Sequence, residues 1–168
     1  IAAGEVLERP ASIVKELIEN ALDAEATNIT VSILNGGKDY IEVEDNGVGM
    51  SKKDIPWAFL RHATSKISEE NDLFNIGTMG FRGEALPSIA SVSKVTLYSN
   101  KSEKAGLKAE LENGIIKELE DYPHPQGTRI IITDLFYNTP ARKKFLKTTV
   151  TEGNRISEIV NKYVLARP

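Results

Sequence analysis

The first candidate for chemistry is a pair of polar residues, Glu16 and Asn20, in a segment with helical periodicity. Residues four positions apart lie on the same side of a helix, so the carboxylate and the amide project together, with Asp23 one turn further along. A carboxylate beside an amide oxygen can hold a water molecule and a hydrated Mg²⁺, an ion that takes few protein ligands. The alternative is that both residues only form the solvated face of an amphipathic helix.

A second candidate is Asp45, which begins the sequence Asp-Asn-Gly-Val-Gly-Met directly after an apolar strand. If Asp45 points inward, its carboxylate can accept a hydrogen bond from a base amino group, a contact worth about 1.5–3 kcal/mol. Adenine offers an amine where guanine offers a carbonyl, so this contact favours adenine. Gly47 and Gly49 would let a ligand ring approach the backbone. Because Asp-Asn-Gly is also a strong turn sequence, an ordinary loop is the alternative.

A glycine-rich segment is the third candidate. Gly77, Gly80 and Gly83 are spaced by three residues and lead directly into a predicted helix start. Exposed backbone N–H groups and the positive end of a helix dipole can bind phosphate. Upstream, Thr64-Ser65-Lys66 could add two hydroxyls and one cation to the same phosphates. The alternative is a long surface loop without a ligand.

Two smaller signals lie in the second half of the chain. Gly127-Thr128 enters a predicted strand and could place a hydroxyl under a bound base, although this dipeptide is common at strand starts. The second signal is a cationic cluster that consists of Arg142, Lys143, Lys144 and Lys147. These side chains can contact DNA phosphates without sequence specificity. The alternative is that they only belong to a solvated loop.

Several classes of protein are excluded or disfavoured. The sequence has neither a P-loop motif, nor a complete dinucleotide-binding G-x-G-x-x-G, nor a G-x-S-x-G nucleophile elbow. It has no cysteine, and His62 and His124 lie far apart, which disfavours a histidine metal site. Its 21 basic and 24 acidic residues argue against a basic surface over the whole chain. The longest apolar runs, such as Ile130–Ile132, are far shorter than the roughly 20 residues of a membrane span.

The length favours one domain over residues 1–168, and the hydrophobic pattern predicts an α+β fold with helices and strands in two layers. Because the sequence opens at Ile1 without methionine, we expect it to be a fragment of a longer protein. A β-hairpin is expected over 29–45, turning at Gly36-Gly37, and residues 64–83 are expected to form a long loop. Helices are expected over 10–26 with Ser12 as cap, 51–61 with Ser51 as cap, 84–90 and 151–166. Four further strands are expected, mostly antiparallel, over 94–99, 106–112, 115–121 and 128–135.

Five segments together resemble the MutL family of DNA mismatch repair proteins, within the superfamily of gyrase, Hsp90 and histidine-kinase ATPases. They are KELIENALDAEAT, DNGVGM, RHATSK, GFRGEAL and FYNTPARKKFL. The resemblance extends over nearly the whole chain, and the last two segments are specific to the mismatch repair branch. It implies the α/β sandwich of that superfamily, which contains a left-handed βαβ unit, with a mixed, mostly antiparallel sheet and helices on one face.

The resemblance implies Mg²⁺-dependent binding of ATP and hydrolysis at its γ-phosphate. It makes Glu16 the general base that orients the attacking water, Asn20 the Mg²⁺ ligand and Asp45 the aspartate that reads adenine. It places the remaining ATP contacts at Gly49, Thr64, Ser65, Lys66, Gly80, Arg82, Gly83, Glu84, Ala85, Leu86 and Thr128.

The resemblance also implies that ATP orders a lid over 67–83 and draws two such domains into a homodimer. The implied partners are DNA, the mismatch-recognition protein MutS and a downstream nuclease or helicase, in the bacterial cytoplasm near the nucleoid or in a eukaryotic nucleus. One lysine for the γ-phosphate would come from a following domain, so slow hydrolysis is expected of this chain. A DNA-binding module without hydrolysis and a gyrase-like ATPase remain alternatives, although the segment 136–146 speaks against the latter.

Overall fold

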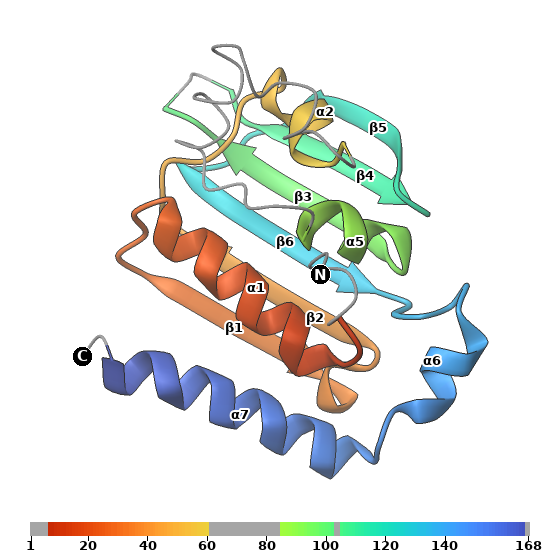
Figure 1. Cartoon of the computed structure of the whole chain (residues 1–168). Helices are drawn as coiled ribbons and strands as arrows, with labels where there is room; N and C mark the ends of the chain where they lie inside the picture. Colours follow the sequence, from red (N-terminus) through yellow and green to blue (C-terminus); the bar gives the residue numbers. More distant parts are fainter. Residues whose placement is uncertain (1–6, 61–84, 103–104, 167–168) are drawn as a thin grey trace, which may run out of the picture.

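The computed structural model describes residues 7–60, 85–102 and 105–166, which form a sheet covered by helices on one face (Figure 1). The sheet of the described part has the strand order β1-β2-β6-β3-β4-β5, and all neighbouring strands are antiparallel. The strands are β1 (Ile29–Leu34), β2 (Tyr40–Asp45), β3 (Lys94–Asn100), β4 (Leu107–Glu112), β5 (Ile115–Asp121) and β6 (Gly127–Thr133). The helices are α1 (Pro10–Asp23), the 3-10 turn η2 (Asn35–Gly37), α2 (Asp54–Ala58), α5 (Ala85–Ser91), α6 (Pro140–Phe145) and α7 (Thr149–Ala166).

The core lies between the sheet and helices α1 and α5. Strand side chains alternate between the two faces, so each strand sends every second residue into the core. On β2, Ile41 and Val43 are buried while the neighbouring Tyr40 and Glu42 are not. Helix α1 contributes an apolar stripe at three- and four-residue spacing, which consists of Ile13, Val14, Leu17, Ile18 and Ala21. The predicted two-layer α+β class is confirmed.

The predicted hairpin and its turn are also confirmed. Gly36 and Gly37 have φ values of +68° and +84°, a backbone conformation that residues with a side chain rarely adopt. A Cβ atom at Gly36 would lie 2.6 Å from the carbonyl oxygen of Thr149, at the start of α7. Glycine at this position therefore lets the tip of the hairpin contact the C-terminal helix.

The first helix begins at residue 10 as predicted but ends at Asp23 rather than at 26, and both predicted serine caps are wrong. Helix α1 begins at Pro10, a residue that suits the first position of a helix because it has no N–H to leave unsatisfied. The backbone N–H of Ser12 donates to the carbonyl oxygen of Arg9, so Ser12 already lies inside the first turn. Helix α2 has five residues only. Ser51 is not its cap, since Lys53 occupies the N-cap position. The N–H and the hydroxyl of Ser51 instead both donate to the Asp54 carboxylate, at 2.9 and 3.0 Å.

The solvated loop that was the alternative for the cationic cluster is not what the structure shows, because residues 140–145 form helix α6. It is a short helix with Pro140 in its first turn and no buried residue, so no apolar stripe announces it. The Thr-Pro dipeptide before it is typical of a helix start. The bounds of the expected helix 84–90 and of the expected strands lie within two residues of the observed ones, wherever the structure describes those bounds. The expected loop at 64–83 lies outside the described residues. No helix of the described part is long and apolar enough to cross a membrane.

A buried carboxylate ties α7 to the start of α1. Glu152, in the first turn of α7, is fully buried and accepts the backbone N–H of Lys147 at 2.7 Å. Its other oxygen lies 3.6 Å from Nη1 of Arg9, the residue that caps α1. This distance is too long for a hydrogen bond, so the attraction is a Coulombic one between two largely desolvated groups. The pair therefore fixes the helix that carries Glu16 and Asn20 against the C-terminal helix.

Replacing Glu152 by Ala is expected to lower the free energy of unfolding by about 3 kcal/mol, because it leaves the Arg9 guanidinium without its counter-charge. Urea denaturation measures the change. Glu158→Ala, at an exposed position of the same helix, is the matched control and should change stability by less than about 0.5 kcal/mol. Equal effects of the two substitutions would show that the Arg9–Glu152 pair does not fasten the helices.

Candidate functional site

Helix α1, strands β2 and β6, the loop 46–50 and the start of α5 surround one small cavity. Among the described residues that line it, three have polar side chains, Asn20, Asp45 and Thr128, and the rest are apolar or glycine. Gly49 and Leu86 also line it, so the fold brings five of the predicted nucleotide contacts together from distant parts of the sequence. A concave apolar surface with a few convergent polar groups is the usual form of a small-molecule site.

Asp45 is the last residue of β2, and its carboxylate is the most strongly constrained polar group of the cavity. Oδ1 accepts the backbone N–H of Gly47 at 2.8 Å, and the backbone N–H of Thr128 also donates to this carboxylate. Burial raises the pKa of Asp45 above its ordinary value, and the hydrogen bonds from Gly47 and Thr128 only partly oppose that rise. An ionised Asp45 in this position is therefore stabilised by any further N–H donor that enters the cavity.

The loop after Asp45 packs so closely on the strand ends that two positions require glycine. Gly49 has a φ of +77°, and a Cβ atom there would lie 2.0 Å from the carbonyl oxygen of Asn100. A Cβ atom at Gly127 would lie 2.1 Å from the carbonyl oxygen of Asp45. The sequence suggested that Gly49 admits a ligand ring, whereas contact between backbone segments already demands glycine here. Asn46 holds the same loop from the other side by accepting the N–H groups of residues 27 and 28.

The Asn20 amide faces the cavity with an unsatisfied polar atom. Its Nδ2 is buried and has no hydrogen-bond partner among the residues that the structure describes. Native proteins rarely leave such a group unpaired, so a ligand is the natural partner. Rotation of the amide by 180° exchanges nitrogen and oxygen, and the residue can then offer an oxygen to a metal.

The donor set fits Mg²⁺ only if the metal arrives with other ligands. The described residues contain no group of three or more His, Cys, Asp or Glu side chains that could hold a metal ion. Mg²⁺ takes one or two protein oxygens and completes its octahedron with water and substrate phosphates. Asn20 as a single protein ligand is consistent with this pattern, and phosphate oxygens would have to supply further ligands.

Glu16 lies one turn before Asn20 on α1 and does not belong to the cavity wall formed by the described residues. Its side chain is 20% exposed, and Oε2 lies 3.8 Å from Nζ of Lys15. One helical turn covers about 5.4 Å, so a ligand that reaches Glu16 must extend from the cavity along the helix. An elongated molecule such as a nucleoside triphosphate has this shape.

The remaining predicted contacts divide into two groups. Ala85 and Leu86 begin α5, where both are buried and only Leu86 lines the cavity. Seven others lie outside the described residues, namely Thr64, Ser65, Lys66, Gly80, Arg82, Gly83 and Glu84.

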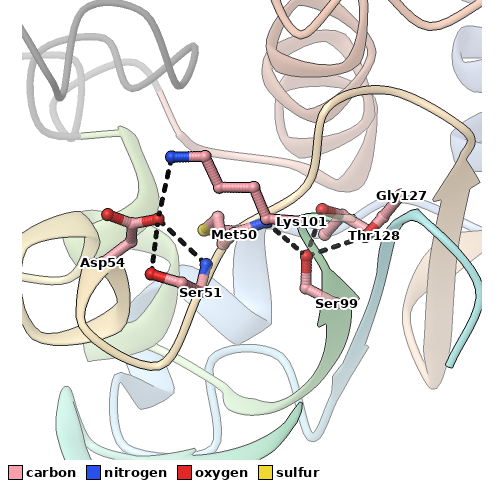
Figure 2. A network of polar contacts seen from close by, with 7 residues as sticks. All are labelled: Met50, Ser51, Asp54, Ser99, Lys101, Gly127 and Thr128. Atoms are coloured by element: carbon pink, nitrogen blue, oxygen red, sulfur yellow. Dashed lines mark hydrogen bonds and ion pairs between the residues drawn. The ribbon is translucent and has the colours of Figure 1, made fainter. Parts of the chain in front are cut away.

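Sequence reasoning missed Ser99, a buried residue on β3 that joins three parts of the site (Figure 2). Its hydroxyl oxygen lies 2.8 Å from the backbone nitrogen of Met50, 2.7 Å from the carbonyl oxygen of Gly127 and 2.8 Å from Oγ1 of Thr128. One signal was available in the sequence. The alternation of β3 places Val95, Leu97 and Ser99 on the buried face, so the pattern puts a polar side chain in the core at position 99.

The predicted cationic cluster lies on and after α6. Lys143, Lys144 and Lys147 are exposed, and the Arg142 guanidinium lies 6.0 Å from the centre of the Phe136 ring. Arg142 and Lys147 also border a surface hollow of about 410 Å³ together with Arg9 and the largely exposed Phe145. The cluster is thus an accessible positive surface, built on a helix rather than on a loop.

Comparisons with known proteins agree on the family to which the chain belongs. Residues 8–138 match the family described as histidine kinase-, DNA gyrase B- and HSP90-like ATPase. The whole chain is 60% identical to the DNA mismatch repair protein MutL of Syntrophomonas wolfei and 55% identical to that of Shouchella clausii. It spans only 29% and 26% of the lengths of these two relatives.

Solved structures agree with the sequence relatives. The Aquifex aeolicus MutL ATPase domain complexed with ADP superposes with a TM-score of 0.76 at 38% identity, over 95% of this chain and 56% of that one. The ATPase domain from the mismatch repair endonuclease Aquifex aeolicus MutL gives a TM-score of 0.74 at 36% identity, over 97% and 55% of the two chains.

Replacing Asp45 by Asn is expected to raise the free energy of unfolding of the ligand-free chain at pH 7. A raised pKa in the folded state means that Asp45 stabilises the fold at pH values below its ordinary 3.8 and loses that contribution as the pH rises through the folded-state pKa. The advantage of Asn should therefore be largest at pH 7 and vanish in acid. Urea denaturation at pH 7 and at a pH below 3.8 measures it, with the exposed Asp39→Asn as control. An advantage that is independent of pH would contradict the assigned cost of burying this charge.

Proposed function

We propose that this chain, which belongs to the family of histidine kinase-, DNA gyrase B- and Hsp90-like ATPases, binds ATP with Mg²⁺ and hydrolyses its γ-phosphate. The observation that carries the proposal is the single cavity in which Asn20 of α1, Asp45 of β2 and Thr128 of β6 converge. In the proposed complex the base lies in this cavity and the triphosphate extends along α1 toward Glu16.

The base-binding end of the cavity favours adenine. Asp45 accepts two backbone N–H groups and keeps acceptor capacity for a third donor, which the amino group of adenine would provide. Guanine would direct a carbonyl oxygen at the same carboxylate. The apolar walls, which include Leu17 and Ile130, would cover the two faces of the base.

The phosphate end works by positioning, since phosphoryl transfer leaves little covalent chemistry to the protein. Asn20 and phosphate oxygens would hold Mg²⁺, which would neutralise charge that develops on the phosphates. The Glu16 carboxylate would orient the attacking water as a general base. The two residues share one side of α1, so the helix fixes the distance between them.

The wider role that we propose is that of the N-terminal domain of a MutL-type mismatch repair protein, a domain that residues 1–168 form on their own. ATP would order a lid over 67–83, bring two copies of the domain together, and transmit a signal from MutS to a nuclease or helicase on DNA. Such a protein acts wherever the chromosome lies, in the bacterial cytoplasm or in a nucleus. The sequence similarity to MutL proteins over the whole chain supports this role over a gyrase-like one.

Binding and turnover should separate in two variants of the protein. Asp45→Asn is expected to weaken ATP binding, because an amide that presents N–H toward the adenine amine opposes it. Glu16→Gln should leave ATP affinity nearly unchanged and reduce hydrolysis by about 10²- to 10⁴-fold, the usual contribution of a general base. Calorimetric titration with ATP and Mg²⁺ measures the first, and phosphate release by the longer natural protein measures the second.

Two outcomes of this experiment would contradict the proposal. The first is an unchanged ATP affinity of Asp45→Asn, which would place the nucleotide elsewhere. The second is wild-type hydrolysis by Glu16→Gln, which would assign the base to another residue. Asp39→Asn serves as the control for both measurements, since its carboxylate is exposed and lies outside the cavity.

A second activity, DNA binding without sequence specificity, is favoured by the cationic cluster of α6. Three of its cations, Lys143, Lys144 and Lys147, are exposed, so they can approach a phosphate backbone without desolvation of a buried group. The net charge of the chain is negative, and attraction to DNA would therefore be local to this surface.

The double variant Lys143→Gln/Lys144→Gln is expected to bind duplex DNA more weakly than the wild type. Each lost phosphate contact should reduce the slope of log K against log salt concentration by about 0.9. Fluorescence anisotropy over a salt series measures both quantities, with the exposed Lys117→Gln on β5 as control. Binding that does not weaken with salt would exclude this surface as the DNA site.

A further inference from the structure

The Glu16 carboxylate has a cation beside it on α1. Nζ of Lys15 lies 3.8 Å from Oε2 of Glu16, which is beyond hydrogen-bond distance. The same ammonium lies closer to Glu19, at 3.3 Å from its Oε2. Two carboxylates on neighbouring rows of one helix therefore face a single ammonium, and Glu19 holds it at the shorter distance.

Tyr163 of α7 anchors Glu19 in this position. Helices α1 and α7 lie side by side (Figure 1), and the Tyr163 side chain lines a groove together with Ile18 and Leu22 of α1. Its hydroxyl donates to Oε2 of Glu19 at 2.6 Å, and this is the oxygen that faces Lys15. Burial and the hydrogen bond to Glu19 raise the pKa of Tyr163 above its ordinary value, so the phenol keeps its proton and remains a donor.

The anchor matters because the pair of Lys15 and Glu19 is weak by itself. The two residues are four positions apart with the lysine first, which is the less favourable order for an ion pair on a helix. Their side chains are 46% and 38% exposed, so water screens the attraction between them. Without the Tyr163 hydroxyl, Glu19 can adopt other rotamers, and the ammonium is then able to close on Glu16.

We infer that Tyr163 and Glu19 are positioning residues for hydrolysis, because together they keep the Lys15 ammonium from closing on the Glu16 carboxylate. An ammonium has three N–H donors and no acceptor, so a direct bond to Glu16 would occupy a lone pair that the attacking water needs. A general base works only when the proton that it accepts is within hydrogen-bond reach. The inference rests on the proposed ATPase function and adds to it a contact from the C-terminal helix.

The restraint should affect turnover and leave nucleotide binding unchanged. Lys15, Glu19 and Tyr163 are not among the described residues that line the cavity. Loss of the Tyr163 hydroxyl should therefore lower kcat without changing KM for ATP. A general loss of packing between α1 and α7 would instead disturb the helix that carries Asn20, and it would raise KM as well.

Tyr163→Phe, which keeps the ring in the groove and removes the hydroxyl, tests the inference. Steady-state phosphate release by the longer natural protein with Mg²⁺ measures kcat and KM. kcat should fall about two- to fivefold, the size of one lost hydrogen bond, while KM stays at the wild-type value. Lys15→Gln removes the competing ammonium, so Tyr163→Phe should have no further effect in that background. Glu19→Gln should act like Tyr163→Phe, and Lys15→Gln should again cancel its effect.

The matched control is Tyr122→Phe, which removes a phenol hydroxyl directly after β5, at the opposite edge of the sheet from β1. Its kcat and KM should equal those of the wild type. An unchanged kcat in Tyr163→Phe, a rise in KM, or an equal loss in the Lys15→Gln background would overturn the inference. If Tyr163→Phe does not fold, Glu19→Gln with and without Lys15→Gln decides by the same criteria. Wild-type hydrolysis by Glu16→Gln would instead refute the proposed base on which the inference rests.

Discussion

Close packing of backbone against backbone shapes the candidate site. The loop that follows β2 lies directly on the ends of β3 and β6, and only glycine fits at the two points of closest approach. At Gly49 and Gly127 an added Cβ would come within 2.0 and 2.1 Å of a carbonyl oxygen. This contact brings the Gly47 and Thr128 N–H groups to the Asp45 carboxylate. The site is therefore preorganised by the sheet, without help from a ligand.

The same packing sets the chemistry of the cavity. The Asp45 carboxylate, buried at the end of β2, presents lone pairs to an otherwise largely apolar part of the cavity. Its burial is costly while the cavity is empty, and N–H donors relieve that cost. At the other end, the Arg9–Glu152 pair fastens α1 against α7, so the helix that presents Asn20 and Glu16 is held independently of the nucleotide. In the proposed complex, base recognition and phosphate chemistry would therefore depend on separate contacts.

The sequence predicted the strands well, because period-two alternation on β2, β3 and β4 matches burial on one face of the sheet. The resemblance to MutL, seen in five segments, is confirmed by relatives and structures. Helix ends were predicted less well. Ser12 and Ser51 are of a residue type that often caps a helix, but whether a serine acts as a cap depends on the position at which the backbone enters the helix, which the residue type does not give. The contacts of Ser99 could not be predicted, because they join β3 to β6 and to the loop 46–50, and no local pattern encodes such distances. Helix α6 lacks an apolar stripe and escaped notice for that reason.

The most direct test of the central claim is a crystal structure of the chain with Mg²⁺ and a non-hydrolysable ATP analogue. The account predicts the adenine amino group within hydrogen-bond distance of Asp45, the phosphates beside α1, and the Asn20 amide oxygen bound to Mg²⁺. Phosphates bound away from Asn20, or a base outside the cavity between α1, β2 and β6, would contradict it.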